Sequence, residues 1–282
     1  MRVDAHVHFW GRAELERYEW MGPEMNAIRR PFGPEDLRGH LEHHGFERAV
    51  LVQTLSSVDE TRTYLELAEA TAFIGGVVGW VDLTDPGVGE SVAALRDGPG
   101  GRYLVGIRHQ VHDELDPDWL GREDVRRGLR ALGEAGLAYD VLVRTRELPA
   151  ALDTVRALPE LRFVVDHIAK PPIASGELEP WAERLAAVAE LDHVSCKLSG
   201  LVTEAAWESW RPADVLPYAQ RVAEWFGEER LLFGSDWPVC TLAASYDDVV
   251  ALAEQIIGAG NERVFGANAE RVYQLPLQRR RS

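Results

Sequence analysis

The chain has 282 residues, 46% of them hydrophobic, and a formal net charge of −16. A chain of this length can bury a large core, and no Ser/Gly/Pro-rich linker, repeat or low-complexity run divides it, so we predict a single domain spanning residues 1–282. The negative charge argues against nucleic acid and anionic membrane surfaces as partners, because both would be repelled over most of the surface. We therefore expect a small-molecule partner.

The ends of the chain and its cysteines indicate the cellular compartment in which we expect the protein. The N-terminus lacks the apolar stretch of a signal peptide, and no segment approaches the roughly 18 apolar residues of a membrane helix, so we expect a cytoplasmic protein. Cys196 and Cys240 are expected to be reduced structural thiols. Residues 276–282, which end in a run of arginines, are predicted to form a frayed tail. The sequence leaves the oligomeric state open, a homo-oligomer included.

Short β-rich runs alternate along the chain with amphipathic stretches. The predicted strands cover residues 3–8, 49–53, 74–81, 103–108, 138–143, 163–167, 194–198 and 231–235. The predicted helices cover 34–44, 59–72, 88–96, 123–135, 147–158, 178–191, 213–226 and 245–257. Such alternation favours a parallel sheet, and eight units in a chain near the ~250 residues typical of the fold favour an α/β architecture, the closed (β/α)8 TIM barrel. An open doubly wound sheet is the alternative.

Two histidines close the first predicted strand. From Val3 to Phe9 the odd positions are apolar and the even ones polar, so strict alternation places His6 and His8 on one face. Burying two imidazoles without partners would cost about 2 to 7 kcal/mol per unsatisfied group. A shared divalent cation would remove that cost.

A third histidine and a carboxylate fall at equivalent places. In a parallel barrel the chemistry lies at the C-terminal ends of the strands, and His167 and Asp236 follow the sixth and eighth predicted strands. With His6 and His8 they form a nitrogen and oxygen ligand set that suits zinc, or manganese as the alternative, with open positions for water. We predict one divalent metal ion held by these four residues.

Lysine is rare in this chain, since only Lys170 and Lys197 are lysines among 30 basic residues. A position that keeps lysine where arginine is the default plausibly needs a compact primary amine. Lys197 shares the polar face of its predicted strand with Ser195 and Ser199, and we expect this face to point inward. Lys170 follows His167 by three residues, and a plain surface cation is the alternative for it.

Several other residues are candidates for contact with a substrate. Arg108 and His109 end the fourth predicted strand, and Arg108 with the two lysines would form a positive rim suited to a carboxylate or to many oxygens. An interior ion pair is the alternative for Arg108. Trp10 and Trp237 adjoin proposed ligands, and their rings suit either a sugar face or core packing.

The connection formed by residues 11–33 is unusually long for a strand-to-helix link at the active end of a barrel. It includes Tyr18, Trp20, Met21 and Phe32. Long connections without regular structure are commonly functional lids, so we predict that this loop covers the site.

The sequence resembles the amidohydrolase superfamily, and within it the branch of sugar lactonases related to L-fuconolactonase and L-rhamnonolactonase. The segments that carry the resemblance are 4–10 (DAHVHFW), 79–83 (GWVDL), 106–109 (GIRH), 166–171 (DHIAKP), 197–201 (KLSGL) and 233–239 (FGSDWPV). The resemblance implies a (β/α)8 barrel, hydrolysis at a carbonyl, and a metal position surrounded by the four ligands named above.

The resemblance also leads to a mechanistic hypothesis, the hydrolysis of an aldono-lactone. Asp236 would take a proton from the attacking water and return it to the departing ring oxygen. The metal, or donors such as His167 and Lys197 if no metal is bound, would stabilise the oxyanion. Two-metal members of the superfamily use a carboxylated lysine, which the strand 138–143 lacks, and some similar lactonases are thought to need no metal. Metal-independent catalysis therefore remains an alternative.

Two rival functions stay open from the sequence alone. The first is a metal-dependent aromatic-acid decarboxylase on the same scaffold, which shares the histidine pair, the later histidine and the final aspartate. The second is a non-catalytic protein that binds a sugar acid. The presence of Asp236 argues against the second rival, because binding alone gains little from a proton shuttle.

Overall fold

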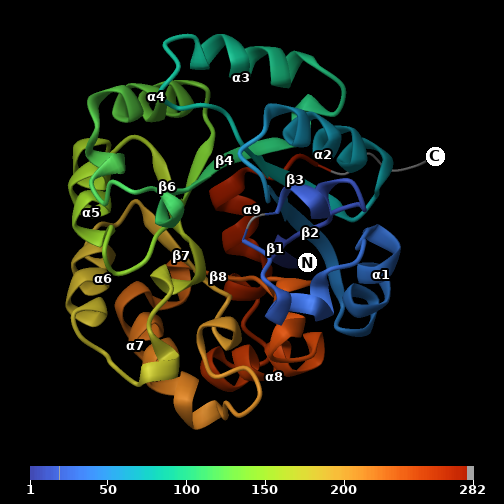
Figure 1. The fold of residues 1–282 in the computed structure, drawn as a ribbon, viewed down its shortest axis with the longest axis vertical. Helices are drawn as coiled ribbons and strands as arrows, with labels where there is room; N and C mark the ends of the chain where they lie inside the picture. The colour runs from blue at the N-terminus through green and yellow to red at the C-terminus, as the bar shows by residue number, and fades with distance from the viewer. Residues whose placement is uncertain (19, 278–282) are drawn as a thin grey trace.

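The computed structural model describes residues 1–18 and 20–277, and its central element is an eight-stranded parallel sheet in the order β1 to β8 (Figure 1). The strands are β1 (Arg2–Val7), β2 (Phe46–Val52), β3 (Ile74–Gly79), β4 (Leu104–Gln110), β5 (Ala138–Leu142), β6 (Arg162–Val165), β7 (Val194–Leu198) and β8 (Leu231–Phe233). The prediction of a (β/α)8 TIM barrel is confirmed.

The barrel closes where its first and last strands meet. Just beyond β8, the amide of Asp236 donates a hydrogen bond of 2.9 Å to the carbonyl of His6. The amide of His8 donates one of 2.8 Å to the carbonyl of Trp237, and Val7 pairs with Trp237 in a parallel bridge. These backbone contacts between residues 6–8 and residues 236–237 form a seam. The seam joins the first and last strands at the C-terminal end of the barrel.

Helices form the outer layer, each with one apolar face turned toward the strands (Figure 1). They are α1 (Pro34–His43), α2 (Val58–Ala70), α3 (Val88–Asp97), α4 (Glu123–Glu134), α5 (Leu148–Ala157), α6 (Trp181–Ala189), α7 (Pro212–Arg230) and α8 (Tyr246–Ile257). A further helix, α9 (Asn268–Tyr273), does not belong to this layer. The predicted helices overlap α1 to α8. β6 ends at Val165 and β8 at Phe233, two residues before the predicted ends, because the chain turns out of the sheet there.

The short helix α9 was not predicted from the sequence. It lies within the ring of strands (Figure 1), and its residues Ala269, Val272 and Tyr273 pack against inward-facing strand residues such as Val3 and Ala5. The π-helical segment Arg263–Ala267 before it lies against the N-terminal residue Met1. This segment and α9 therefore close the end of the barrel opposite the predicted site.

Strict alternation along β1 was wrong for the first half of the strand, because Val3 and Ala5 pack inside the barrel, the side to which His6 and His8 also point. Asp4 was expected on the same face as His6, but its carboxylate accepts a hydrogen bond of 2.9 Å from the hydroxyl of Tyr246 on the outer helix α8. The register between β1 and β2 is irregular between Asp4 and Val7. This irregularity lets Ala5 pack inside the barrel while His6 and His8 still point to the site.

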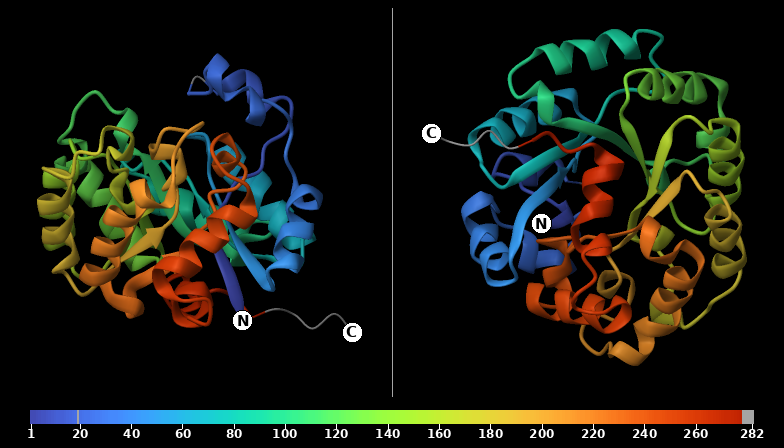
Figure 2. Two further views of the ribbon diagram at one scale, coloured as in Figure 1. Left: turned by 90° about the horizontal axis from the view of Figure 1, so that it is seen from below. Right: turned by 180° about the vertical axis from the view of Figure 1, so that it is seen from behind.

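Residues 11–18 and 20–33 form a strap above the C-terminal end of the barrel (Figure 2, left). In the described part, the strap contains two 3-10 helices, Glu14–Arg17 and Pro23–Ile28, and it buries Tyr18, Ile28 and Phe32. The place predicted for a lid is therefore occupied, whereas lid motion stays a prediction. In the predicted tail, Pro276 and Leu277 extend beyond α9, and the arginine run lies outside the described residues.

Two further expectations concern membrane-spanning helices and the state of the two cysteines. Among the described residues, none of the helices combines the length and the apolar character needed to cross a membrane. Cys196 and Cys240 are both buried free thiols, as expected for structural cysteines.

Substituting Gly266 tests how the lower end of the barrel is closed. A Cβ at this position would lie 2.0 Å from the backbone carbonyl oxygen of Met1, so Gly266→Ala must displace backbone. We expect the free energy of unfolding to fall by about 1–3 kcal/mol, as for overpacked cores. Gly133→Ala in α4 is the matched control, because its Cβ would meet only Leu161 at 3.8 Å. Urea denaturation showing equal stability for both variants would contradict this packing.

Candidate active site

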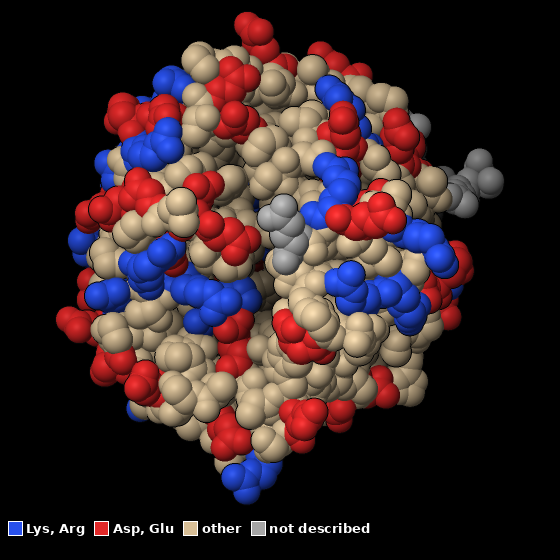
Figure 3. Space-filling view, viewed as in Figure 1, with Lys and Arg blue, Asp and Glu red and all other residues tan. Residues whose placement is uncertain are grey.

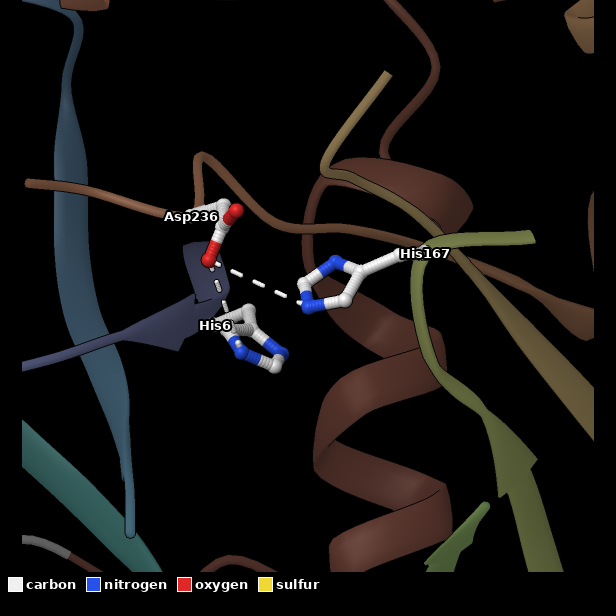
Figure 4. Close-up of side chains that lie close together, drawn as sticks. All are labelled: His6, His167 and Asp236. Atoms are coloured by element: carbon white, nitrogen blue, oxygen red, sulfur yellow. Dashed lines mark ion pairs between the residues drawn. The ribbon is translucent and has the colours of Figure 1, made fainter. Parts of the chain in front are cut away.

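Three imidazoles surround one carboxylate oxygen at the C-terminal end of the barrel. Figure 4 shows two of them, those of His6 and His167, facing Asp236. The Nε2 atoms of His8, His6 and His167 lie 3.4, 3.8 and 3.9 Å from Oδ1 of Asp236. The Nε2 atoms of His6 and His8 are 3.1 Å apart. The four residues predicted as metal ligands from the sequence are therefore brought together.

Two of these side chains, those of His167 and Asp236, belong to residues with left-handed backbone conformation. His167, Ile168, Ala169 and Lys170 follow β6 with φ angles between 46° and 59°, and Asp236 has a φ of 59°. Left-handed residues other than glycine cost roughly 1–2 kcal/mol each, so packing must hold this turn in place. The indole of Trp181 on α6 contributes a hydrogen bond of 2.8 Å to the carbonyl of Ile168.

Each imidazole is also held at its Nδ1 atom. His8 Nδ1 donates to the carbonyl of Val52 at 2.8 Å, and His167 Nδ1 lies 2.9 Å from the hydroxyl of Ser199. His6 Nδ1 lies 3.5 Å from Oδ1 of Asp166. With its Nδ1 held in this way, each ring turns its Nε2 atom toward a common point beside Asp236, as histidine ligands do in metal sites.

Burial sets the protonation of the group. It lowers the pKa of His167 well below the usual range, and burial together with the Lys197 charge does the same for His6. Burial alone would raise the pKa of Asp236, but the neighbouring His167 and His8 lower it below its ordinary value. At neutral pH His6 and His167 are therefore neutral and the Asp236 carboxylate is ionised.

The donor set fits a divalent metal ion. One ligand atom from each of His6, His167 and Asp236 lies within 4.8 Å of the others, and all three residues are buried. Unprotonated imidazole nitrogens and a carboxylate are ligands of zinc and related ions. His8 contacts two members of this set, so it completes a candidate metal centre of four side chains.

A cavity of about 330 Å³ opens above these residues and includes His8, His167 and Asp236 in its floor. Figure 3 looks onto this end of the barrel, where the surface is hollowed near its centre and Lys and Arg side chains lie beside the hollow. The strap contributes Trp20 and Met25 to the cavity wall. The other lining residues are Thr54, Arg108, Gln110, His112, Asp113, Leu142, Arg144, Lys170, Thr203, Glu204, Trp207, Val239 and Leu242.

One side of the cavity carries positive charge. Arg108, Arg144 and Lys170 line it, and Glu204 lies between the last two, 2.5 Å from Lys170 Nζ and 3.4 Å from Arg144 Nη1. Lys170 thus points into the cavity, as in the prediction of a substrate contact. Arg108 combines both roles considered for it, since it lines the cavity and also pairs with Asp166 at 3.0 Å.

Lys197 lies elsewhere than its predicted role requires. The sequence placed it correctly on the inward face of β7, but its side chain is fully buried and does not line the cavity. Its ammonium group is 2.5 Å from Asp140 and 2.9 Å from Asp166. We therefore revise the expectation that Lys197 touches the substrate, because its amine is already bound between two carboxylates.

Three predicted substrate contacts also lie away from the cavity. His109 stacks on Trp119 with ring centroids 4.2 Å apart, because alternation along β4 turns it away from the side that Arg108 faces. Trp10 is buried and donates its indole hydrogen bond to the carbonyl of Arg30 at 2.7 Å. Trp237 is buried against the strap. For both tryptophans the described structure matches the packing alternative.

Sequence reasoning missed several residues of the site. Arg144 follows β5 and Asp166 follows β6, so the rule that found His167 could also have found them. His112 and Glu204 lie in short connecting segments, where no strand periodicity marks them. Burial, and secondarily Lys170, lowers the pKa of His112 to about 3, so it is neutral in the cavity.

Comparison with known proteins decides the family. The family model described as Amidohydrolase matches residues 3–275. The chain belongs to this amidohydrolase family. The match begins in β1 and ends just after α9, so it includes every residue of the candidate metal centre.

Three relatives resemble this amidohydrolase over nearly their whole length. An L-fucono-1,5-lactonase of Burkholderia ambifaria is 41% identical over 97% of this chain and 96% of its own, and an L-fucono-1,5-lactonase of Burkholderia multivorans is 38% identical over 98% and 97%. A crystal structure of a Burkholderia multivorans amidohydrolase with bound zinc superimposes with a TM-score of 0.92 at 38% identity, covering 98% of this chain and all of the other.

Removing the indole nitrogen of Trp181 tests what holds the left-handed turn. Trp181→Phe keeps an aromatic ring but leaves the buried carbonyl of Ile168 without its donor, so we expect a loss of about 1–3 kcal/mol in unfolding free energy. Trp225→Phe is the control, since Trp225 packs on Trp181 and makes no indole hydrogen bond within the described part of the chain. If chemical denaturation gives the same loss for both variants, the hydrogen bond is not what stabilises the turn.

Proposed function

We propose that this amidohydrolase hydrolyses a sugar lactone, an aldono-lactone of the L-fucono-1,5-lactone type, to the sugar acid. The observation that carries the proposal is the ionised Asp236 carboxylate, set among three imidazoles at the floor of a cavity with a positive wall. The full-length similarity to two proteins named L-fucono-1,5-lactonase supports the same reaction. An internal ester is an activated carbonyl, and it needs less assistance than an amide.

We propose His6, His8, His167 and Asp236 as the residues that would hold one zinc ion, with manganese as the alternative. When bound, the ion would supply Lewis-acid polarisation of the lactone carbonyl. The zinc-bound relative supports this choice of metal, and the ligand set in this chain is the one expected for it.

Asp236 is the proposed proton shuttle. As an ionised carboxylate it accepts a proton from the water that attacks the carbonyl carbon, and it then returns that proton to the ring oxygen as the ring C–O bond breaks. The product is an open-chain sugar acid, so water is added across one ester bond and nothing else is consumed. His167 Nε2 lies 3.9 Å from Oδ1 of Asp236, and this neighbour counteracts the effect of burial on the pKa of the carboxyl group.

The positive wall is the proposed binding surface for the oxygens of the substrate. The carbonyl oxygen gains negative charge during attack, and Arg108, whose Nη1 lies 3.3 Å from His6 Nε2, is the cation of this wall that contacts the imidazoles. Arg144 and Lys170 lie further along the wall, paired with Glu204. These side chains would bind the hydroxyl groups and the carboxylate of the product.

The two rivals fare less well against the same observations. A metal-dependent decarboxylase would share the metal centre, but the relatives that match nearly the whole chain at about 40% identity carry the lactonase name. A protein that only binds sugar acids would not need an ionised carboxylate at the cavity floor. Carbon dioxide release from hydroxybenzoates, with no lactone hydrolysis, would favour the decarboxylase.

Asp236→Asn tests the proton shuttle. Loss of a general acid or base typically lowers turnover about 10²- to 10⁴-fold, and we expect a drop in kcat of at least this size for opening of L-fucono-1,5-lactone. Binding of the sugar acid product, measured by calorimetry, should persist because the positive wall is intact. Asp113→Asn changes another carboxylate that lines the cavity and serves as the control, with kcat within a few-fold of wild type. Equal activity of both variants would remove Asp236 from the mechanism.

The pH dependence of kcat/KM follows from the same pKa shifts. A base acts only when deprotonated, so activity is lost as pH falls through its pKa, and the pKa of Asp236 lies below its ordinary value of 3.8. The pKa values of His6 and His167 lie well below 6.5, so protonation of these rings does not intervene near neutrality. We expect kcat/KM, corrected for spontaneous opening, to stay flat from pH 7.5 down to about pH 5. An acid limb centred between pH 6 and 7 would contradict this assignment.

A further inference from the structure

A cluster of four buried charged side chains lies beneath the imidazoles. It consists of Arg108, Asp140, Asp166 and Lys197, which come from four consecutive segments, β4, β5, the turn after β6, and β7. The Lys197 ammonium lies 2.5 Å from Asp140 and 2.9 Å from Asp166, and Arg108 lies 3.0 Å from Asp166. The two cations formally balance the two carboxylates, as a cluster without access to solvent requires.

The upper side of this cluster contacts the metal centre. Oδ1 of Asp166 lies 2.9 Å from Lys197 Nζ and 3.5 Å from His6 Nδ1, so one oxygen faces both groups. Arg108 Nη1 lies 3.3 Å from Nε2 of the same ring, and Lys197 Nζ lies 3.1 Å from its Nδ1. The His6 ring is therefore contacted at both nitrogens by members of the cluster.

The lower side of the cluster contacts the helix that closes the far end of the barrel. The Tyr273 hydroxyl at the end of α9 lies 2.9 Å from both carboxylate oxygens of Asp140 and donates to that carboxylate. The Tyr273 ring centroid lies 5.4 Å from Lys197 Nζ. A continuous series of contacts thus runs from α9 through Asp140, Lys197 and Asp166 to His6.

We propose that Tyr273 and Asp140 are positioning residues for the metal centre. They hold the Lys197 ammonium against Asp166 and the His6 ring, and these two groups in turn fix the orientation of His6 at the cavity floor. The lysine stem is flexible, so its amine stays at Asp166 only if Asp140 holds it from the other side. Only the activity measurement described below rests on the proposed function, because the positioning role of these residues does not require lactone hydrolysis.

The same geometry accounts for a lysine in an arginine-rich chain. Lys197 Nζ has Asp140, Asp166 and the His6 ring nitrogen within 3.1 Å, in a space with no exposed surface. A compact ammonium can donate in three directions from one atom, whereas a planar guanidinium spreads its donors over a wider fork. The space between the two carboxylates therefore selects lysine.

The test compares Tyr273→Phe with Tyr139→Phe. Tyr139 is fully buried next to Asp140, and its hydroxyl makes no hydrogen bond to the cluster side chains within the described residues. Nitrogen-15 spectra of histidine-labelled, metal-free protein report the environment of the two ring nitrogens of His6, whose signals are assigned with His6→Gln. We expect Tyr273→Phe to change the His6 signals and to lower kcat/KM for the lactone about 10-fold to 100-fold, as for lost outer-shell partners. Tyr139→Phe should leave both measurements unchanged.

A charge-neutral double variant separates positioning from stability. Asp140→Asn with Lys197→Met removes one carboxylate and one cation together, so no unpaired charge stays buried. We expect this variant to fold with altered His6 signals. Unchanged His6 signals and kcat/KM within twofold of wild type in Tyr273→Phe would overturn the proposal, even if its stability fell. A wild type that opens no lactone would refute the proposed function, and the His6 signals would still decide the positioning role.

Discussion

The closure of the barrel between its first and last strands is the constraint on which the site depends. The amide of Asp236 binds the carbonyl of His6, and the amide of His8 binds the carbonyl of Trp237. These backbone bonds bring residues more than 220 positions apart in the chain to adjacent places, with two imidazoles on one side of the seam and a carboxylate on the other. The seam makes the metal centre a consequence of the fold, because a barrel opened at this edge would separate Asp236 from both histidines.

Around the seam, the structure combines local backbone strain with balanced buried charge. The left-handed turn at His167 and the left-handed Asp236 are unfavourable in isolation, and the surrounding packing, such as the Trp181 hydrogen bond, holds that turn in place. Beneath the imidazoles, paired carboxylates and cations cancel, so the site keeps neutral histidines above a charged but compensated layer. The fold thereby presents nitrogen lone pairs and one carboxylate to a cavity whose wall is positive.

Much of this arrangement follows from two rules applied to the sequence, alternation along strands and chemistry at the C-terminal strand ends. They correctly brought together His6, His8, His167 and Asp236, and they placed Lys197 inside the barrel. These rules failed where the role of a residue depends on how deeply it is buried or on which side chains it contacts. Lys197 lies below the cavity because Asp140 and Asp166 bind it, which a strand pattern does not reveal, and His109 faces outward because it neighbours inward-facing Arg108. The short helix α9 was missed because six residues carry too little periodicity.

The central claim is that four side chains from three places in the chain form one metal-binding centre. An anomalous-scattering map from crystals grown with zinc, recorded on both sides of the zinc absorption edge, tests it most directly. The account predicts one strong peak at about 2.0–2.2 Å from His and Asp ligand atoms, among His6, His8, His167 and Asp236. A peak only elsewhere, for instance at the surface group of His43, His44 and Asp247, with none among the four, would contradict the account.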